Sequence, residues 1–210
     1  MKKFLSLALI LVLAAVFCSA GAEGSMLDAV YDSLDAEAGI HLNYTMIAAS
    51  MGAEINYDVH AKGTSGYTLK TSHAFGQTVV SASCFIEDTS YMLNPDQMEA
   101  QAILTLSPTL LKYHSYIRSD ELGKLMDKWA HNSGFTVETR EVDGVSYTVE
   151  VYPADGGTEV AFYFDESGHL ACVRNDSISS LGELFYTIYA IDTEVDESLF
   201  DISAYTVISK

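Results

Sequence analysis

The sequence predicts an α+β fold, with one antiparallel sheet in a single domain. Segments in which apolar and polar residues alternate lie in both the first and the last part of the chain, and the residues between them have helix-type spacing. The strand-like segments follow one another without the helix-after-strand rhythm of parallel sheets. A chain of 210 residues suits one domain of ordinary size.

Residues 1–22 are expected to form a signal peptide. Lys2 and Lys3 precede an apolar run over residues 4–17, and Ala20-Gly21-Ala22 offers the small residues that a signal peptidase reads. The run is short for a membrane span, and no later segment reaches the roughly 18 apolar residues that one needs. We therefore expect an exported protein (extracellular, periplasmic or in the cell envelope) with no transmembrane segment after cleavage.

Cys18 leaves lipid anchoring as an alternative fate for this segment. The residue before it is Phe17, where a lipoprotein signal has Gly, Ala or Ser. Anchoring is therefore disfavoured, and residues 23–210 are expected to form the folded domain.

The folded domain is expected to begin with a short helix and an antiparallel meander. Leu27, Val30, Tyr31 and Leu34 fall on one helical stripe after a candidate N-cap at Ser25. The alternating runs that follow, each bounded by turn residues, predict strands over residues 40–46, 55–60, 67–71, 78–86 and 90–93.

The middle of the chain is expected to be helical, and a second meander follows it. Residues 95–106 and 108–116 lack the strand period, and a clearer helix starts after Ser119 and ends near Gly134. Its apolar stripe is Leu122, Leu125, Met126 and Trp129. Alternation then predicts strands over residues 135–142, 145–152, 158–164, 169–174 and 184–191, before a terminal segment over 199–208.

Charge and motifs exclude several classes of function. The chain carries 29 acidic against 11 basic side chains, a net charge of −18, which disfavours binding to nucleic acid and to anionic membranes. The nucleophile, phosphate-loop and zinc-protease motifs are absent, so we expect a protein that is not an enzyme.

No metal site is expected from the sequence. The six histidines (His41, His60, His73, His114, His131 and His169) are spread over separate segments, which favours single histidines over a cluster assembled by folding. The acidic run Asp192, Glu194, Asp196 and Glu197 lacks the glycine and the spacing of a calcium loop, so a solvated turn is favoured.

Two cysteines, Cys84 and Cys172, lie in strand-like runs of the folded domain. An exported protein can form disulfides, and this pair would close a long loop. Two separate buried thiols are the equal alternative, because only the topology decides whether the two strands meet.

Aromatic side chains crowd the expected strands. In Ala161-Phe162-Tyr163-Phe164 and in Phe185-Tyr186-Thr187-Ile188-Tyr189 both faces of the strand carry bulky residues. A sheet with one solvent-exposed face does not need bulky apolar residues on both faces. Either helices therefore cover the second face or the sheet curls around a cavity. Plain core packing and a ligand cavity both remain open.

The C-terminal half contains four stretches with a familiar pattern: residues 143–153, 158–170, Tyr189-Ala190-Ile191-Asp192 and Val195-Asp196-Glu197-Ser198-Leu199-Phe200. Together they resemble the LolA-like superfamily of exported lipid- and lipoprotein-binding proteins. It implies a strongly curved, incomplete antiparallel barrel whose concave face is apolar and covered by helices. It also implies binding of acyl-chain lipids or lipoproteins without a cofactor.

This chain departs from that superfamily in one respect. The lipoprotein carriers have an arginine on an early strand, and this arginine joins the lid to the barrel. The arginines here are Arg118, Arg140 and Arg174, all beyond the first meander. No residue of this chain matches that arginine, which disfavours the carrier role proper.

These observations predict a non-enzymatic, exported protein that binds a hydrophobic or lipid-like ligand, or a lipidated protein, between sheet and helices. The expected partners are an acyl-chain ligand and, in second place, a lipoprotein or envelope protein. The alternative is an interaction or sensing module of the same fold without a cavity. The expected ligand-binding residues are Tyr44, Tyr57, Phe85, Leu122, Leu125, Met126, Trp129, Tyr147, Phe162 and Tyr186.

Overall fold

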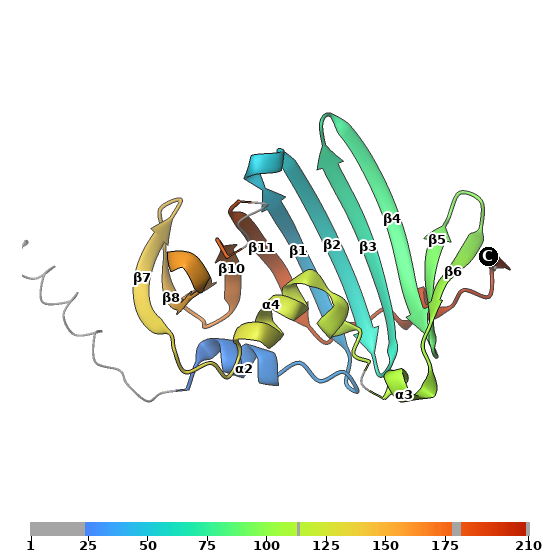
Figure 1. The fold of residues 1–210 in the computed structure, drawn as a ribbon, viewed down its shortest axis with the longest axis horizontal. Helices are drawn as coiled ribbons and strands as arrows, with labels where there is room; N and C mark the ends of the chain where they lie inside the picture. The colour runs from blue at the N-terminus through green and yellow to red at the C-terminus, as the bar shows by residue number, and fades with distance from the viewer. Residues whose placement is uncertain (1–23, 113, 178–181, 209–210) are drawn as a thin grey trace, which may run out of the picture.

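The computed structural model describes residues 24–112, 114–177 and 182–208 and shows one large open sheet with helices against it (Figure 1). The expected signal peptide and Cys18 lie outside the described residues. Within them, no helix combines the length and the apolar character needed to cross a bilayer.

Twelve strands form the sheet, in the order β12-β6-β5-β4-β3-β2-β1-β11-β10-β9-β8-β7. Their bounds are β1 Ile40–Ala48, β2 Ala53–Lys62, β3 Ser65–Ala74, β4 Gln77–Ile86, β5 Thr89–Asn94, β6 Glu99–Thr105, β7 Thr136–Val142, β8 Val145–Pro153, β9 Glu159–Phe164, β10 Leu170–Asn175, β11 Leu184–Asp192 and β12 Thr206–Ile208. All neighbouring pairs are antiparallel except β12 and β6, which run parallel. The sheet is not closed into a barrel, because β7 and β12 remain as its edges.

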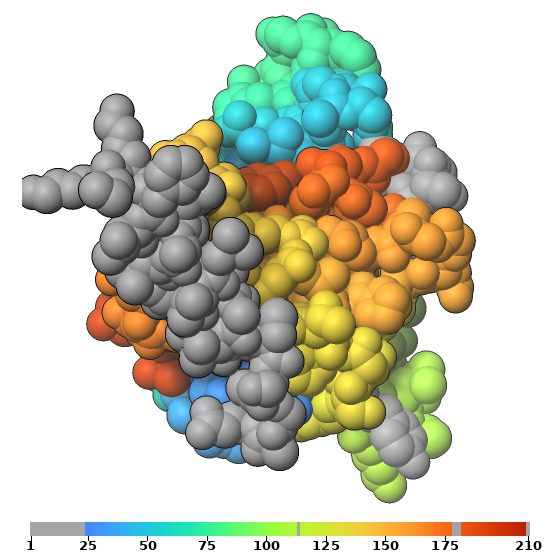
Figure 2. All heavy atoms as spheres, turned by 90° about the vertical axis from the view of Figure 1, so that its left-hand side faces the viewer, coloured from blue at the N-terminus to red at the C-terminus, as the bar shows by residue number. Residues whose placement is uncertain are grey.

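Three α-helices accompany the sheet in the described part of the chain: α2 Met26–Asp32, α3 Pro108–Leu111 and α4 Glu121–Trp129. Helix α4 crosses in front of the central strands and α2 lies near the lower end of the sheet, while the hairpin tips of β1–β2 and β3–β4 extend beyond them (Figure 1). A view from the β7 side shows the same tips standing clear of the body of the molecule (Figure 2). Short 3-10 turns lie at Ala49–Met51, Ile117–Ser119, Asp155–Gly157 and Glu197–Phe200.

The two meanders meet in the middle of the sheet. Strand β1 pairs with β2 on one side and with β11 on the other, so the first strand of the chain lies beside the eleventh. Residues 40–48 and 184–192 therefore form the seam that joins the strands β1–β6 to the strands β7–β11.

The main hydrophobic core lies between the helices and one face of this sheet. It contains buried residues of α2, α4 and six strands (β1, β2, β8, β9, β10 and β11). Two smaller clusters lie on the opposite face, one over β8–β10 and the other over β3–β6, where Ile202 and Tyr205 of the C-terminal segment cover it. We call the first surface the helix-covered face and the second the outer face.

The middle of the chain departs from the helical prediction. Residues 95–106, expected to be helical, contain strand β6, which forms a hairpin with β5 and alternates between Ala100 and Ala102 on one side and Glu99 and Gln101 on the other. Pairing with β5 and β12 outweighs the helix propensity of alanine, glutamate and glutamine. The expected helix over 108–116 shrinks to the four residues of α3.

The bounds of the longest helix also differ from the expected ones. Its N-cap is Asp120 instead of Ser119, and it ends at Trp129 instead of continuing toward Gly134. The terminal segment 199–208 forms a 3-10 turn followed by the short strand β12.

Candidate functional site

The helix-covered face brings together most of the side chains expected to bind a ligand. Tyr44, Tyr57, Phe162 and Tyr186 come from β1, β2, β9 and β11, and each is at most 7% exposed. Strand alternation explains the grouping, because Tyr44 lies directly opposite Tyr57 in the register and every second residue shares a face. All four belong to the main core cluster.

Helix α4 lies on this cluster as expected. Leu122, Leu125, Met126 and Trp129 are all buried and all belong to it, because their spacing puts them on one side of the helix. The helix approaches its preceding turn closely: a Cβ at Gly123 would lie 2.0 Å from the carbonyl oxygen of Ile117. The four side chains therefore form a continuous apolar cover over the aromatic residues of the sheet.

A buried carboxylate fixes the start of α4 to the sheet. Asp120 accepts hydrogen bonds of 3.0 Å from the backbone N–H groups of Leu122 and Gly123, and one of 2.8 Å from the hydroxyl of Tyr44. Burial raises the pKa of Asp120, and these hydrogen bonds oppose the rise by favouring the charged form. Burial likewise raises the pKa of Tyr44, so its hydroxyl remains a donor.

A second buried carboxylate fixes the start of α2. Glu150 on β8 is 1% exposed and accepts hydrogen bonds from the Ser25 hydroxyl at 2.8 Å, from the Met26 backbone N–H at 2.5 Å and from the Tyr152 hydroxyl at 2.9 Å. The free N–H groups at a helix N-terminus favour a negative charge there. Both helices on this face are thus attached at their N-terminal ends by a carboxylate and a tyrosine.

Two of the expected ligand-binding residues lie apart from this group. Tyr147 belongs to the cluster on the outer face, where its ring meets that of Tyr163 edge-to-face. Phe85 is 3% exposed on β4 and packs against His114, with ring centroids 4.0 Å apart. The structure therefore assembles eight of the ten expected residues.

These eight side chains pack against one another. The rings of Tyr44 and Tyr57 stack with centroids 4.7 Å apart, and Tyr44 also meets Tyr186 at 6.1 Å. The ring centroids of Trp129 and Tyr152 lie 5.6 Å apart. The indole N–H of Trp129 has no hydrogen-bond partner among the described residues. A buried donor without a partner is costly, so this indole is a point where an incoming acceptor would gain a hydrogen bond.

A hollow of about 480 Å³ lies beside α2, at the margin of the helix-covered face. Its apolar wall contains Val30, Leu170, Ile188 and Ile191, all of which belong to the main core cluster or pack against it. Ser33, Asp165, His169 and Asp192 contribute polar groups. None of these was expected from the sequence, because the hollow depends on how α2 docks beside β11 and the β9–β10 turn.

A cluster of polar side chains on the outer face was also missed by the sequence interpretation. His41 and His60 do not stay apart as expected: their rings stack 4.5 Å apart, with Asp58 beside both. A hairpin centred on Ser50 and Met51 pairs residue 41 with residue 60. The two histidines lie equally far from this turn along the sequence, and that spacing could have predicted their contact. Desolvation lowers the pKa of His60.

The disulfide alternative does not hold for the two cysteines of the folded domain. Both are free and buried, Cys84 on β4 and Cys172 on β10, in different clusters of the outer face. Four strands separate β4 from β10 in the sheet, so the topology keeps the two thiols apart.

Comparison with known proteins finds no matching family model and no matching curated protein sequence. Similar solved structures include an uncharacterized conserved protein from Thermus thermophilus, with 8% identity and a TM-score of 0.48 over 88% of this chain and 97% of that one. LprF from Mycobacterium bovis has 12% identity and a TM-score of 0.44 over 83% and 97% of the two chains. A LolA superfamily protein from Nitrosomonas europaea has 11% identity and a TM-score of 0.35 over 86% and 98%.

Proposed function

We propose that this chain is an exported, non-enzymatic binding protein for a hydrophobic or lipid-like ligand, or for the lipid of a lipidated protein. The ligand enters between the sheet and the helices, with the helix-covered face forming the concave wall. The observation that carries this proposal is the continuity between the hollow beside α2 and the apolar core, since the hollow shares its wall with that core.

The size and lining of the hollow support this function. Its volume of about 480 Å³ lies in the range of pockets that hold small ligands, roughly 300–1,000 Å³. Val30, Ile188 and Ile191 would cover an apolar chain, while Asp165 and His169 would remain near its polar end. Removing apolar surface from water would provide the affinity, at roughly 25 cal/mol per Å² before the costs of binding.

The eight packed residues would contribute as the deeper wall. Because they leave little space between one another, deeper entry requires α4 to move away from the sheet. Trp129 would then offer its unpaired indole N–H to a ligand oxygen. In this proposal the hollow is the entrance, and Leu122, Leu125 and Met126 line the path that opens under the helix.

A pair of variants on α2 tests the proposal. Val30 lines the hollow, whereas the neighbouring Ala29 is exposed on the same helix. Purified protein is incubated with hexadecanoate, a diacyl phospholipid and a diacylglyceryl-cysteine peptide, and uptake is followed by native mass spectrometry. We expect Val30→Glu to weaken uptake about tenfold or more, because a charge would face the apolar chain, and Ala29→Glu to bind as the wild type does.

The second candidate function is an envelope interaction module without a ligand cavity. The stacking of Tyr44 on Tyr57 and the burial of their neighbours favour it, since interlocked aromatic side chains are those of an ordinary core. Failure of the wild-type protein to take up any of the three lipid probes would overturn the ligand proposal and leave this module. Equal uptake by Val30→Glu and wild type would overturn the hollow as the entrance.

A further inference from the structure

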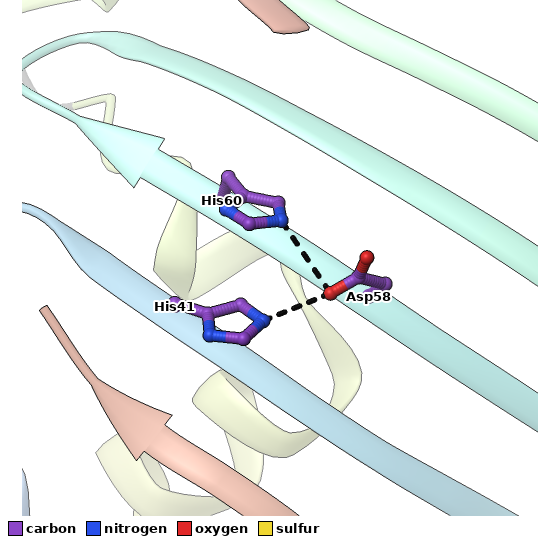
Figure 3. Close-up of side chains that lie close together, drawn as sticks. All are labelled: His41, Asp58 and His60. Atoms are coloured by element: carbon purple, nitrogen blue, oxygen red, sulfur yellow. Dashed lines mark hydrogen bonds and ion pairs between the residues drawn. The ribbon is translucent and has the colours of Figure 1, made fainter. Parts of the chain in front are cut away.

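The outer face carries a compact group of two imidazoles and a carboxylate. His41 comes from β1, and Asp58 and His60 come from β2, the next strand in the sheet. Figure 3 shows both rings directed to the same carboxylate oxygen of Asp58. The His41 Nε2 lies 2.9 Å and the His60 Nε2 lies 3.5 Å from this Oδ1, and one candidate atom from each side chain lies within 4.8 Å of the others.

We propose that His41, Asp58 and His60 form a binding site for a divalent transition-metal ion of the zinc type. Two imidazole nitrogens and one carboxylate oxygen are a donor set that suits zinc, whereas calcium and magnesium prefer oxygen ligands alone. Metal–ligand bonds of 2.0–2.2 Å in a tetrahedron put ligand atoms about 3.3 Å apart, and the distances of 2.9 and 3.5 Å lie on either side of this value.

A second carboxylate orients one of the rings. The Nδ1 of His41 lies 3.2 Å from Oδ1 of Asp192 on β11. A carboxylate on the far nitrogen of a ligand histidine holds the ring in place and fixes its proton there, which leaves the other nitrogen free to bind metal. His41 is therefore arranged as metal-binding histidines are, with Nε2 directed into the site.

Burial further distinguishes this group from an ordinary surface ion pair. The side chain of His60 is 9% exposed and that of His41 is 18% exposed, while Asp58 is 37% exposed and leaves the site open on one side. Three protein ligands with one open side are compatible with a fourth position taken by water. Because Leu42 and Val59, the neighbours of these histidines, point into the main core, the backbone of both strands is held firmly.

The second ring predicts a specific consequence of metal binding. The backbone N–H of Asp196 donates a 3.3 Å hydrogen bond to Nδ1 of His60, so the ring proton of neutral His60 is on Nε2 in this arrangement. Coordination through Nε2 requires that proton to move to Nδ1. The amide of Asp196 would then lose its acceptor, and the turn at Glu197–Phe200 would report metal binding at a distance from the ion.

The test uses zinc chloride as the probe and the untagged protein, with calorimetric titration and amide NMR. We expect one zinc ion per folded chain, a rise in the thermal unfolding midpoint on zinc addition, and a shift of the Asp196 amide resonance. His41→Gln and His60→Gln should each weaken binding about 100-fold, and Asp192→Asn about 10- to 100-fold, because that carboxylate only orients the ring.

His131→Gln is the matched control. His131 also lies between two carboxylates, with Nε2 at 3.2 Å from Asp32 and Nδ1 at 3.7 Å from Asp28, but no second imidazole joins it among the described residues. We expect zinc binding of this variant to equal that of the wild type. Asp58→Asn provides a further ligand variant if a histidine variant does not fold, as judged by circular dichroism.

Three results would overturn the proposal. They are the absence of stoichiometric zinc binding to the wild type, binding that survives replacement of both His41 and His60, and equal loss on His131→Gln. Lipid uptake is measured separately on the wild type, so failure of this site and failure of the proposed ligand function are distinguishable.

Discussion

Tyr44 on strand β1 donates a 2.8 Å hydrogen bond to Asp120, the residue that caps helix α4. The same carboxyl group accepts hydrogen bonds from the first free backbone N–H groups of the helix, so one buried side chain joins the helix to the sheet. A tyrosine and an aspartate thus make this contact between helix and strand.

Replacement of Asp120 tests this connection. We expect Asp120→Ala to lower the free energy of unfolding by about 1–3 kcal/mol, because the helix loses its cap and Tyr44 loses its acceptor. Asp120→Asn keeps an acceptor oxygen and should cost less. Urea unfolding followed by circular dichroism measures both variants, and equal stability of Asp120→Ala and wild type would show that the cap contributes nothing.

Glu150 provides a parallel prediction for α2. Its two carboxylate oxygens accept hydrogen bonds from Ser25, Met26 and Tyr152. A glutamine in its place would turn an NH2 group, itself a donor, toward some of these donors and leave them without an acceptor. We expect Glu150→Gln to destabilise the protein by about 1–3 kcal/mol for each donor left unpaired. The control is Glu141→Gln on the same part of the sheet, which is exposed and should leave the unfolding midpoint unchanged.

Acid should destabilise the protein partly through Glu159. A hydrogen bond from Arg140, 2.8 Å long, is the main reason that the pKa of Glu159 lies below its usual 4.5. A carboxyl group with a lowered pKa binds fewer protons when folded, so its stabilisation is complete above its usual pKa and is lost as the pH falls through the lowered value.

The thermal unfolding midpoint should therefore decrease as the pH falls below about 4.5, the usual pKa of a glutamate. Because the pair is partly exposed, we expect Glu159→Gln to cost only about 0.2–1 kcal/mol near neutral pH. The difference between this variant and the wild type should disappear in acid. Parallel curves for the two proteins over the whole pH range would show that the Arg140 contact does not contribute.

The two cysteines of the folded domain should react slowly in the native protein. Burial raises the pKa of both Cys84 and Cys172 to about 11, and only the thiolate reacts readily with iodoacetamide. We expect little alkylation at pH 8 in buffer and modification of both residues in guanidinium chloride, as measured by mass spectrometry of tryptic peptides. A peptide pair joined through a disulfide would contradict the free thiols of the structure.

Much of the helix-covered face was predictable, because alternation along one strand and helical spacing are local properties. Tyr44, Tyr57 and the stripe of α4 were placed together on this basis. Alternation does not say which face of a given strand is covered, and Tyr147 shows the result: it lies five positions from Tyr152 on the same strand and therefore faces the other way. Strand β6 was missed because pairing with β5 and β12, and not the helix propensity of its own residues, decided its conformation.

The hollow and the histidine cluster differ in how well the sequence could predict them. The hollow requires the docking of α2 beside β11, which no local pattern encodes. The pairing of His41 with His60 follows from a hairpin whose turn is at residues 50 and 51, so the register was available once both strands were recognised. The nearby Asp192 was not predictable, because it arrives from the eleventh strand of the sheet.

The seam between β1 and β11 has a consequence for how the chain reaches its folded state. During synthesis the first strand emerges long before its partner, since Leu184 at the start of β11 lies 143 positions after His41. Until β11 arrives, β1 presents an unpaired edge with aromatic side chains, and such edges associate with other chains. Pairing over such a long stretch of chain is slow. In a chain with this topology, protection of the N-terminal half therefore limits such association until the C-terminal half is available for pairing.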